Sequence, residues 1–187
     1  DEALAAASAM VVDPPPYAAP RSVSLDADLA GSAPSLELLR ERGLEMRRER
    51  RVAADECDEH GRYRPELAPL LTWAGEPMNG DIGGAALELP DGQLMAWASM
   101  ETRIELCRLP TVGTRIQSFT AGVAVHDKVT HRLHWVYDLD EGDLLTAFEA
   151  VSLAFDIRGR RPMSIPERQR RYELRQLHPD LAPRPPA

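Results

Sequence analysis

The sequence predicts an α+β domain in which a curved antiparallel sheet wraps around one helix. Two observations carry this prediction: residues 65–78 place apolar side chains at helical spacing, and four long strand-like segments follow them. A helix followed by consecutive antiparallel strands is typical of the α+β class. The chain has 187 residues, of which 43% are hydrophobic, and this is enough to bury a sizeable core.

The helical segment is PELAPLLTWAGEPM, residues 65–78. Its apolar residues fall at positions i, i+3, i+4 and i+7 counted from Leu67, which is the spacing of one helical face. Pro69 would cost about 3 kcal/mol in a helix interior because it removes a backbone hydrogen bond. The helix is therefore expected either to begin near Ala68 or to have a distorted first turn.

The strand-like segments are rich in β-branched and aromatic residues and are separated by short, turn-like sequences, which predicts a meander. They are LMAWASMETRIEL (94–106), TRIQSFTAGVAVH (114–126), THRLHWVYDL (130–139) and LLTAFEAVSLAFDI (144–157). The tryptophans and phenylalanines of the chain occupy apolar positions of the pattern, so they are expected to form the core.

The remaining segments divide the chain into four parts. Residues 1–25 contain an apolar, strand-like run at 3–12 and echo residues 143–166, as the last strand of a preceding copy of the domain would. Residues 26–43 form a linker and a short helix that stops at Gly43. Residues 44–167 are the main domain, and 168–187 are a helix and a proline-rich tail. Ser164 and Glu167 predict a capping box for this last helix.

The charge pattern excludes several classes of protein. With 22 basic and 30 acidic residues the net charge is -8, which argues against binding to nucleic acid. No apolar run approaches the roughly 20 residues of a membrane span, and no signal sequence is seen, so a cytoplasmic location is expected. Cys57 and Cys107 form no metal-binding or disulfide pattern. Strand alternation puts His131 and His134 on opposite faces, so no metal site is expected.

The stretch DECDEHGRYRP, residues 55–65, concentrates the reactive side chains. Asp58 and His60 precede Gly61, which allows the backbone to approach a ligand, and a helix start that offers unpaired N–H groups. A carboxylate beside such donors suits general-base or nucleophilic catalysis. A solvated acidic turn is the alternative interpretation. Glu66 and Glu76 are further candidate carboxylates.

The order of strand, turn, helix and meander across residues 46–167 resembles the hotdog-fold thioesterases, in particular the 4-hydroxybenzoyl-CoA thioesterase-like branch and the acyl-carrier-protein thioesterases. Members commonly carry an Asp-x-x-Gly-His-x-Asn corner. Asp58 and Gly61 match its first two positions, whereas Arg62 and Arg64 stand where His and Asn are usual. Gly113 and Thr114 take the place of a later Gly-Asp pair.

This resemblance implies a hotdog domain that hydrolyses an acyl-CoA or acyl-carrier-protein thioester. Asp58 would act as base or nucleophile, with His60 and Glu66 as further catalytic candidates. The acyl thioester would be a substrate, and no cofactor is expected. The substrate-binding candidates are Gly61, Arg62, Arg64, Arg160 and Arg161, the last two in a basic stretch suited to phosphate groups.

The resemblance also implies a partner. Because groove walls in this family come from two domains, the chain is expected to form a homo-oligomer or to pair with another hotdog domain. Arg62 and Arg64 favour an alternative in which this is a catalytically degenerate domain that binds acyl thioesters or supports an active partner. A hydratase is a weaker alternative, because no Asp-x-Asn-Pro-x-His motif is present.

Overall fold

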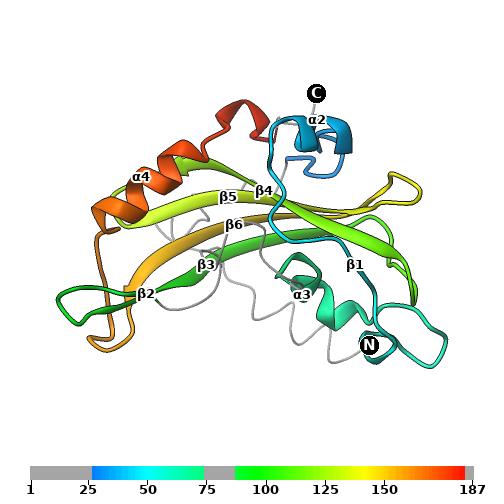
Figure 1. Ribbon diagram of the computed structural model, residues 1–187, viewed down its shortest axis with the longest axis horizontal. Helices are drawn as coiled ribbons and strands as arrows, with labels where there is room; N and C mark the ends of the chain where they lie inside the picture. Colours follow the sequence, from blue (N-terminus) through cyan, green and yellow to red (C-terminus); the bar gives the residue numbers. More distant parts are fainter. Residues whose placement is uncertain (1–26, 74–86, 184–187) are drawn as a thin grey trace, which may run out of the picture.

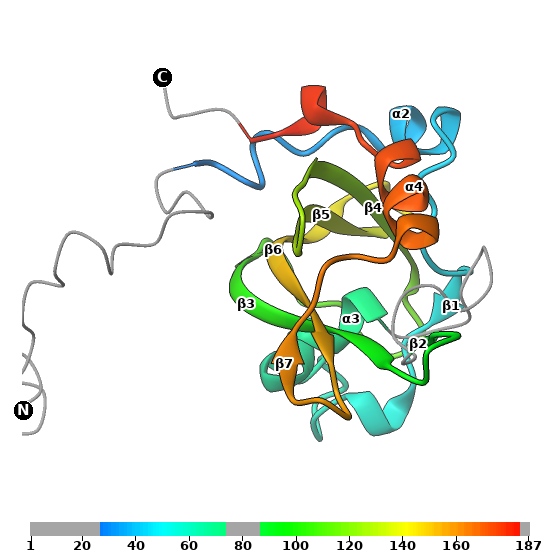
Figure 2. The ribbon, with the colours of Figure 1, turned by 90° about the vertical axis from the view of Figure 1, so that its left-hand side faces the viewer.

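The computed structural model describes residues 27–73 and 87–183. It contains a seven-stranded antiparallel sheet that curls around a helix, which confirms the α+β prediction (Figure 1, Figure 2). The strand order is β1-β4-β5-β6-β3-β2, and β7 pairs with β6. The strands are β1 (Arg50–Arg51), β2 (Leu87–Glu88), β3 (Leu94–Leu106), β4 (Arg115–Val125), β5 (Val129–Asp138), β6 (Leu144–Asp156) and β7 (Arg161–Pro162).

The four long strands lie where the sequence predicts them, but the predicted meander is wrong at its first strand. The strand β3 pairs with β6, from Met95↔Asp156 to Leu106↔Thr146, and not with β4, the next strand in sequence. The reason is the connection at 107–114, which contains Pro110 and Gly113 and is too long for a tight hairpin. This segment crosses the end of the sheet and delivers the chain to β4 on its far side.

Helices are few and short in the described part of the chain. They are α2 (Leu36–Glu41), α3 (Ala68–Trp73) and α4 (Glu167–Arg175), with 3-10 turns η2 (Ala54–Glu56), η3 (Pro65–Leu67) and η4 (Pro179–Leu181). None of these helices combines the length and the apolar character needed to cross a membrane.

The helix predictions are mostly confirmed. The α-helix of the 65–78 segment begins at Ala68, and its first residues form a 3-10 turn, as Pro69 requires. In α2 the N-cap Ser35 accepts a hydrogen bond from Leu38, and Gly43 follows with a φ of 64°. The capping box predicted for α4 is wrong: its N-cap is Pro166, which has no side-chain hydrogen bond.

Several predictions fall on residues outside the described ranges. They are the strand at 3–12, the echo within residues 1–25, the C-terminal part of the 65–78 helix and Glu76.

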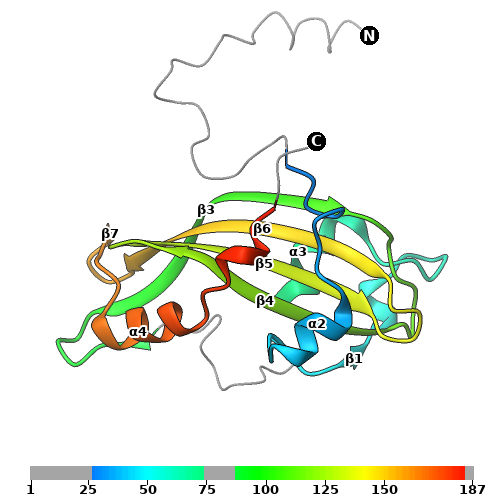
Figure 3. The ribbon, with the colours of Figure 1, turned by 90° about the horizontal axis from the view of Figure 1, so that it is seen from above.

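The two faces of the sheet are covered by different parts of the chain. Neighbouring residues of β5 point to opposite faces, so Trp135 and Val136 belong to two separate cores. Figures 1 and 3 show α3 on the concave face and α2, α4 and η4 on the other side. The concave core consists of Val52, Tyr63, Leu71, Ile116, Val136 and Leu145. The convex core consists of Leu29, Leu39, Leu44, Phe119, Ala121, Leu133, Trp135, Tyr137 and Ala147.

The packing of α3 gives a matched pair of variants. Leu71 is 1% exposed and contacts the concave core, whereas its neighbour Leu70 is 54% exposed. We expect Leu71→Ala to lower the free energy of unfolding by about 2–5 kcal/mol, because it opens a cavity beneath the helix. Leu70→Ala should change it by no more than about 0.5 kcal/mol. Denaturant unfolding of both variants checks this, and equal losses would contradict the described orientation of α3.

Candidate active-site corner

The segment between β1 and α3 folds into a tight turn, here called the corner, residues 57–63. Its two ends pair as an isolated bridge between Cys57 and Tyr63. The Asp58 amide donates to the Arg62 carbonyl at 2.8 Å, and the Gly61 amide donates to the Asp58 carbonyl at 3.0 Å. Gly61 has a φ of 72°, in the left-handed region that side chains disfavour, so a glycine suits this position of the turn.

The carboxylate of Asp58 is fixed by one of its oxygens. Its Oδ1 accepts hydrogen bonds from the backbone amides of His60 and Arg62, both at 2.9 Å. Its Oδ2 accepts none within the described part of the chain, and the residue is exposed. The Arg62 amide, together with that of His60, lowers the pKa of Asp58 from its ordinary value of 3.8. The corner therefore presents an ionised carboxylate with one oxygen available.

Tyr63 anchors the corner to the concave core. Its side chain is 1% exposed, and its hydroxyl donates to the Leu67 carbonyl at 3.2 Å, which ties the corner to the start of α3. Its amide donates to the Pro110 carbonyl at 2.8 Å. Burial raises the pKa of Tyr63 to about 12, so the hydroxyl stays a donor at neutral pH. Tyr63 was not among the predicted site residues, because its burial depends on packing against core residues that are distant in sequence.

Two arginines, Arg50 and Arg64, hold the segment between β1 and the corner in place. Arg50 donates two hydrogen bonds to the Glu56 carboxylate, at 2.6 and 2.9 Å. Burial acts to raise the pKa of Glu56, but the hydrogen bonds from Arg50 and from the Ala53 amide outweigh it and lower this pKa. Arg64 turns back on the same segment, where its guanidinium donates to the Asp55 carbonyl at 2.7 Å.

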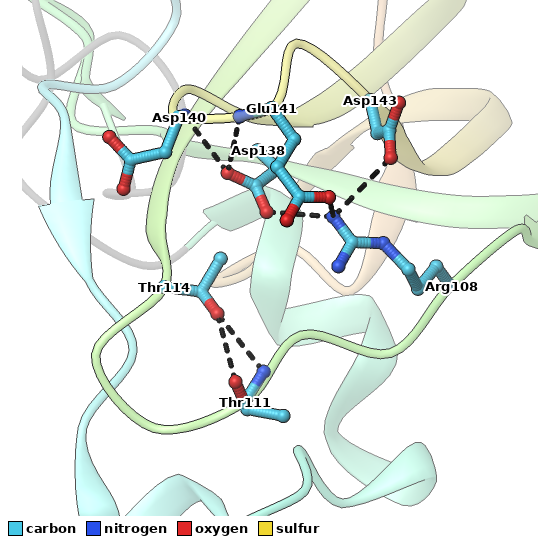
Figure 4. Close-up of polar contacts among 7 residues, drawn as sticks. All are labelled: Arg108, Thr111, Thr114, Asp138, Asp140, Glu141 and Asp143. Atoms are coloured by element: carbon cyan, nitrogen blue, oxygen red, sulfur yellow. Dashed lines mark hydrogen bonds and ion pairs between the residues drawn. The ribbon is translucent and has the colours of Figure 1, made fainter.

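A second polar cluster closes the end of the sheet next to the corner (Figure 4). Arg108 lies 2.7 Å from the buried carboxylate of Asp138 and 3.4 Å from that of Glu141. Asp138 also accepts hydrogen bonds from the Asp140 and Glu141 amides. These bonds fix the β5–β6 turn. The 107–114 connection reaches the corner through the Val112 amide, which donates to the Gly61 carbonyl at 3.0 Å.

The concave face beneath α3 contains an unusual polar group. The His134 side chain is 1% exposed and lies between the rings of Trp73 and Phe148, at centroid distances of 4.9 and 5.4 Å. Its Nδ1 has no hydrogen-bond partner among the described residues. Burial lowers the pKa of His134 to about 3, so the imidazole is neutral. His131 lies on the opposite face, where its Nε2 is 2.7 Å from Glu149 Oε1.

The structure brings only part of the predicted site together. Asp58, His60, Gly61 and Arg62 share the corner. The His60 ring is 71% exposed and 3.8 Å from the Glu59 carboxylate. Glu66 is exposed in the 3-10 turn that follows, and Arg64 is engaged with backbone. Arg160 and Arg161 lie at the opposite end of the sheet, beside the start of β3 (Figure 1).

Comparison with protein-family models and with curated proteins gives no match. Solved structures do match. The probable thioesterase YbaW from Escherichia coli aligns with a TM-score of 0.52 at 12% identity, over 71% of this chain and 98% of that chain. A hypothetical protein from Staphylococcus aureus in complex with CoA gives 0.57 at 13% identity, over 70% and 84%. The 12:0-ACP thioesterase from Umbellularia californica gives 0.56 at 21%, over 73% and 55%. These similarities show that the chain has the hotdog fold.

The hydrogen bonds to Asp58 lead to a prediction about its titration. A lowered pKa keeps the carboxylate charged as the pH falls, so its contribution to stability is present above its unfolded pKa and is lost as the pH falls through its folded pKa. We expect the carboxyl carbon of Asp58 to titrate below 3.8 in a carbon-detected NMR experiment. Titration at or above this value would contradict the two amide hydrogen bonds.

Proposed function

We propose that the chain is an acyl-thioester hydrolase whose catalytic carboxylate is that of Asp58. The observation that carries the proposal is the state of this side chain: one oxygen is fixed by two amides, and the other is exposed at the corner that precedes the helix of a hotdog fold. A carboxylate held in this way stays ionised and keeps a fixed orientation, and a general base or a nucleophile requires both. The fold similarity to thioesterases supports the reaction class.

In the hydrolysis, Asp58 would take a proton from water while the water oxygen bonds to the carbonyl carbon. The C–S bond then breaks, the leaving thiolate takes the proton that Asp58 holds, and the free acid remains while Asp58 is ionised again. Negative charge develops on the carbonyl oxygen. At the start of the helical segment, residues 65–68, the Glu66 amide is the candidate donor for it, because Pro65 has no N–H and the amides of Leu67 and Ala68 already donate to the Arg64 and Pro65 carbonyls. Tyr63 would act as a positioning residue, because its hydroxyl connects the corner to this segment.

The second candidate is a non-hydrolytic domain that binds acyl thioesters or supports an active partner. Two observations favour it. Arg62 and Arg64 stand where the resembling enzymes have His and Asn, and Arg64 donates to the Asp55 carbonyl, which makes it part of the scaffold. In addition, the hydrogen bonds to Asp58 Oδ1 are those of a structural turn, and such a turn needs no catalytic role.

Replacing Asp58 separates the two candidates. Asp58→Asn keeps an oxygen that can accept the two amide hydrogen bonds but removes the charge, so the turn should persist. We expect it to lower kcat/KM for acyl-CoA hydrolysis by about 10²–10⁴-fold. The control is Asp55→Asn, an exposed carboxylate on the same segment, which should leave the rate unchanged. A panel of acyl-CoA thioesters of different chain lengths provides the assay.

Two results would contradict the hydrolase proposal. If folded Asp58→Asn hydrolyses acyl-CoA at the unmodified rate, Asp58 is a structural turn residue only. If the unmodified chain hydrolyses no thioester of the panel but binds acyl-CoA, the non-hydrolytic candidate is correct.

A further inference from the structure

Two polar side chains of the concave face, Ser118 and His134, are buried without a hydrogen-bond partner, and they are here called the polar pair. Ser118 is 3% exposed and His134 is 1% exposed, and neither Ser118 Oγ nor His134 Nδ1 bonds to a described residue. By contrast, the buried hydroxyl of Thr146 donates to the Glu105 carbonyl at 3.1 Å. A buried polar group without a partner lowers the stability of the fold. Stability therefore does not account for the polar pair.

The members of the polar pair are neighbours across the sheet. Residues that pair directly in antiparallel strands point to the same face. Two rows of such residues cross the concave face, one formed by Ser118, Val136, Thr146 and Leu106 and the next by Thr120, His134, Phe148 and Ile104. Ser118 on β4 and His134 on β5 are thus diagonal neighbours, about 7–8 Å apart along the sheet. One polar group that lies between the two side chains can reach both.

The polar pair lies next to the core that holds the corner. Val136 packs in the same cluster as Tyr63, which anchors the corner. His134 is two residues from Val136 on β5, or about 7 Å along the strand. The ring of Trp73, the last residue of α3, lies against His134 and is partly exposed. An acyl group that extends from Asp58 along α3 therefore leads toward the polar pair.

The approach to the polar pair along β3 is apolar and partly open. Leu106 is 45% exposed and lies at the end of β3, where the 107–114 connection starts toward the corner. Ile104 is partly exposed and pairs with Phe148, whose ring lies against His134. Side chains of this kind suit the hydrocarbon chain of an acyl group.

The chemistry of the polar pair favours a hydroxyl group as its ligand. Both members are uncharged at neutral pH, because burial lowers the pKa of His134 to about 3. Arg132, whose charge also lowers this pKa, is paired with Glu173. A charged ligand group would lose its hydration among apolar side chains. A hydroxyl both donates and accepts, so it pairs with His134 Nδ1 in either tautomer and with Ser118 Oγ at the same time.

We propose that Ser118 and His134 form a subsite beneath α3 that binds a hydroxyl group, and that the substrates are acyl thioesters with a hydroxylated aliphatic chain. This inference rests on the proposed function and extends it to the acyl group. The two residues determine specificity and are not catalytic, because they bind the acyl chain and not the thioester carbonyl. The bound hydroxyl completes the hydrogen bonds that the free protein lacks.

The first test is whether the polar pair is unpaired in the free protein. Ser118→Ala and His134→Phe remove the polar atoms and nearly keep the shape, so neither should lower the melting temperature. Thr146→Val removes the donor to the Glu105 carbonyl and should lower it by about 2–4 °C. If Ser118→Ala lowers the melting temperature as much as Thr146→Val does, Ser118 has an internal partner and the subsite is overturned.

The second test compares acyl-CoA thioesters of one chain length, either unsubstituted or hydroxylated at successive carbons. The measured quantity is kcat/KM for the hydroxylated acyl chain divided by kcat/KM for the unsubstituted one. For the carbon that reaches the polar pair, we expect a ratio of about 10 in the unmodified protein. Ser118→Ala and His134→Phe should each lower this ratio to about 1–3. Thr146→Val is the matched control and should keep the ratio, because its hydroxyl is bound within the fold.

Three results of this comparison would overturn the proposal. A ratio of about 1 for every hydroxyl position would show that the polar pair binds no hydroxyl. An equal loss of the ratio in Thr146→Val would show an effect of core packing. Faster hydrolysis of a keto acyl chain than of the hydroxylated one would show a subsite for a carbonyl group.

If the unmodified protein hydrolyses no thioester, the hydrolase proposal fails, and the subsite is decided by binding. Calorimetry with non-hydrolysable thioether analogues should then show about 10-fold tighter binding of the hydroxylated acyl chain than of the unsubstituted one. Ser118→Ala and His134→Phe should each remove most of this difference. Equal affinity of the unmodified protein for the two analogues, at every hydroxyl position, would overturn the inference independently of turnover.

Discussion

The curved sheet has apolar side chains on both faces, and each face must be covered for the fold to be stable. The described residues meet this requirement with three clusters of buried side chains. One lies beneath α3, one lies beneath α2 and the terminal segments, and a smaller one contains Met95, Ala154 and Ile165. Burial of side chains such as Leu71 and Tyr63 is what holds the short helix α3 against the concave face. The helix itself has too few residues to be stable alone. The position of the corner therefore depends on the packing of the concave core.

This packing also positions the polar groups of the corner. Tyr63 connects it to the core, Gly61 permits the tight turn, and the amides of His60 and Arg62 hold Asp58 in its ionised form. The buried Asp138 and its partner Arg108 fix the neighbouring end of the sheet. Preorganised charge of this kind would suit the thioester hydrolysis that we propose. The same arrangement leaves Asp58 and His60 exposed.

Local sequence patterns predicted the helices and strands of the fold well. They did not predict which strands pair when the strands are distant in sequence. The strand at 94–106 has the bounds that its sequence indicates, and the α-helix begins at Ala68 as Pro69 requires. Alternation and proline chemistry act within a few residues, so they are visible in the sequence. The pairing of β3 with β6 depends on the path of the 107–114 connection, which no local signal reveals. Asp58 and Gly61 were found through a motif, but Tyr63 and the Asp138–Arg108 pair emerge only when the chain is folded.

The most direct test is a crystal structure of the chain with a non-hydrolysable thioether analogue of an acyl-CoA. The account predicts that the carbon that replaces the thioester carbonyl lies next to the Asp58 carboxylate, either in direct contact with it or separated from it by one water that Asp58 binds. A ligand bound away from the corner would contradict the account.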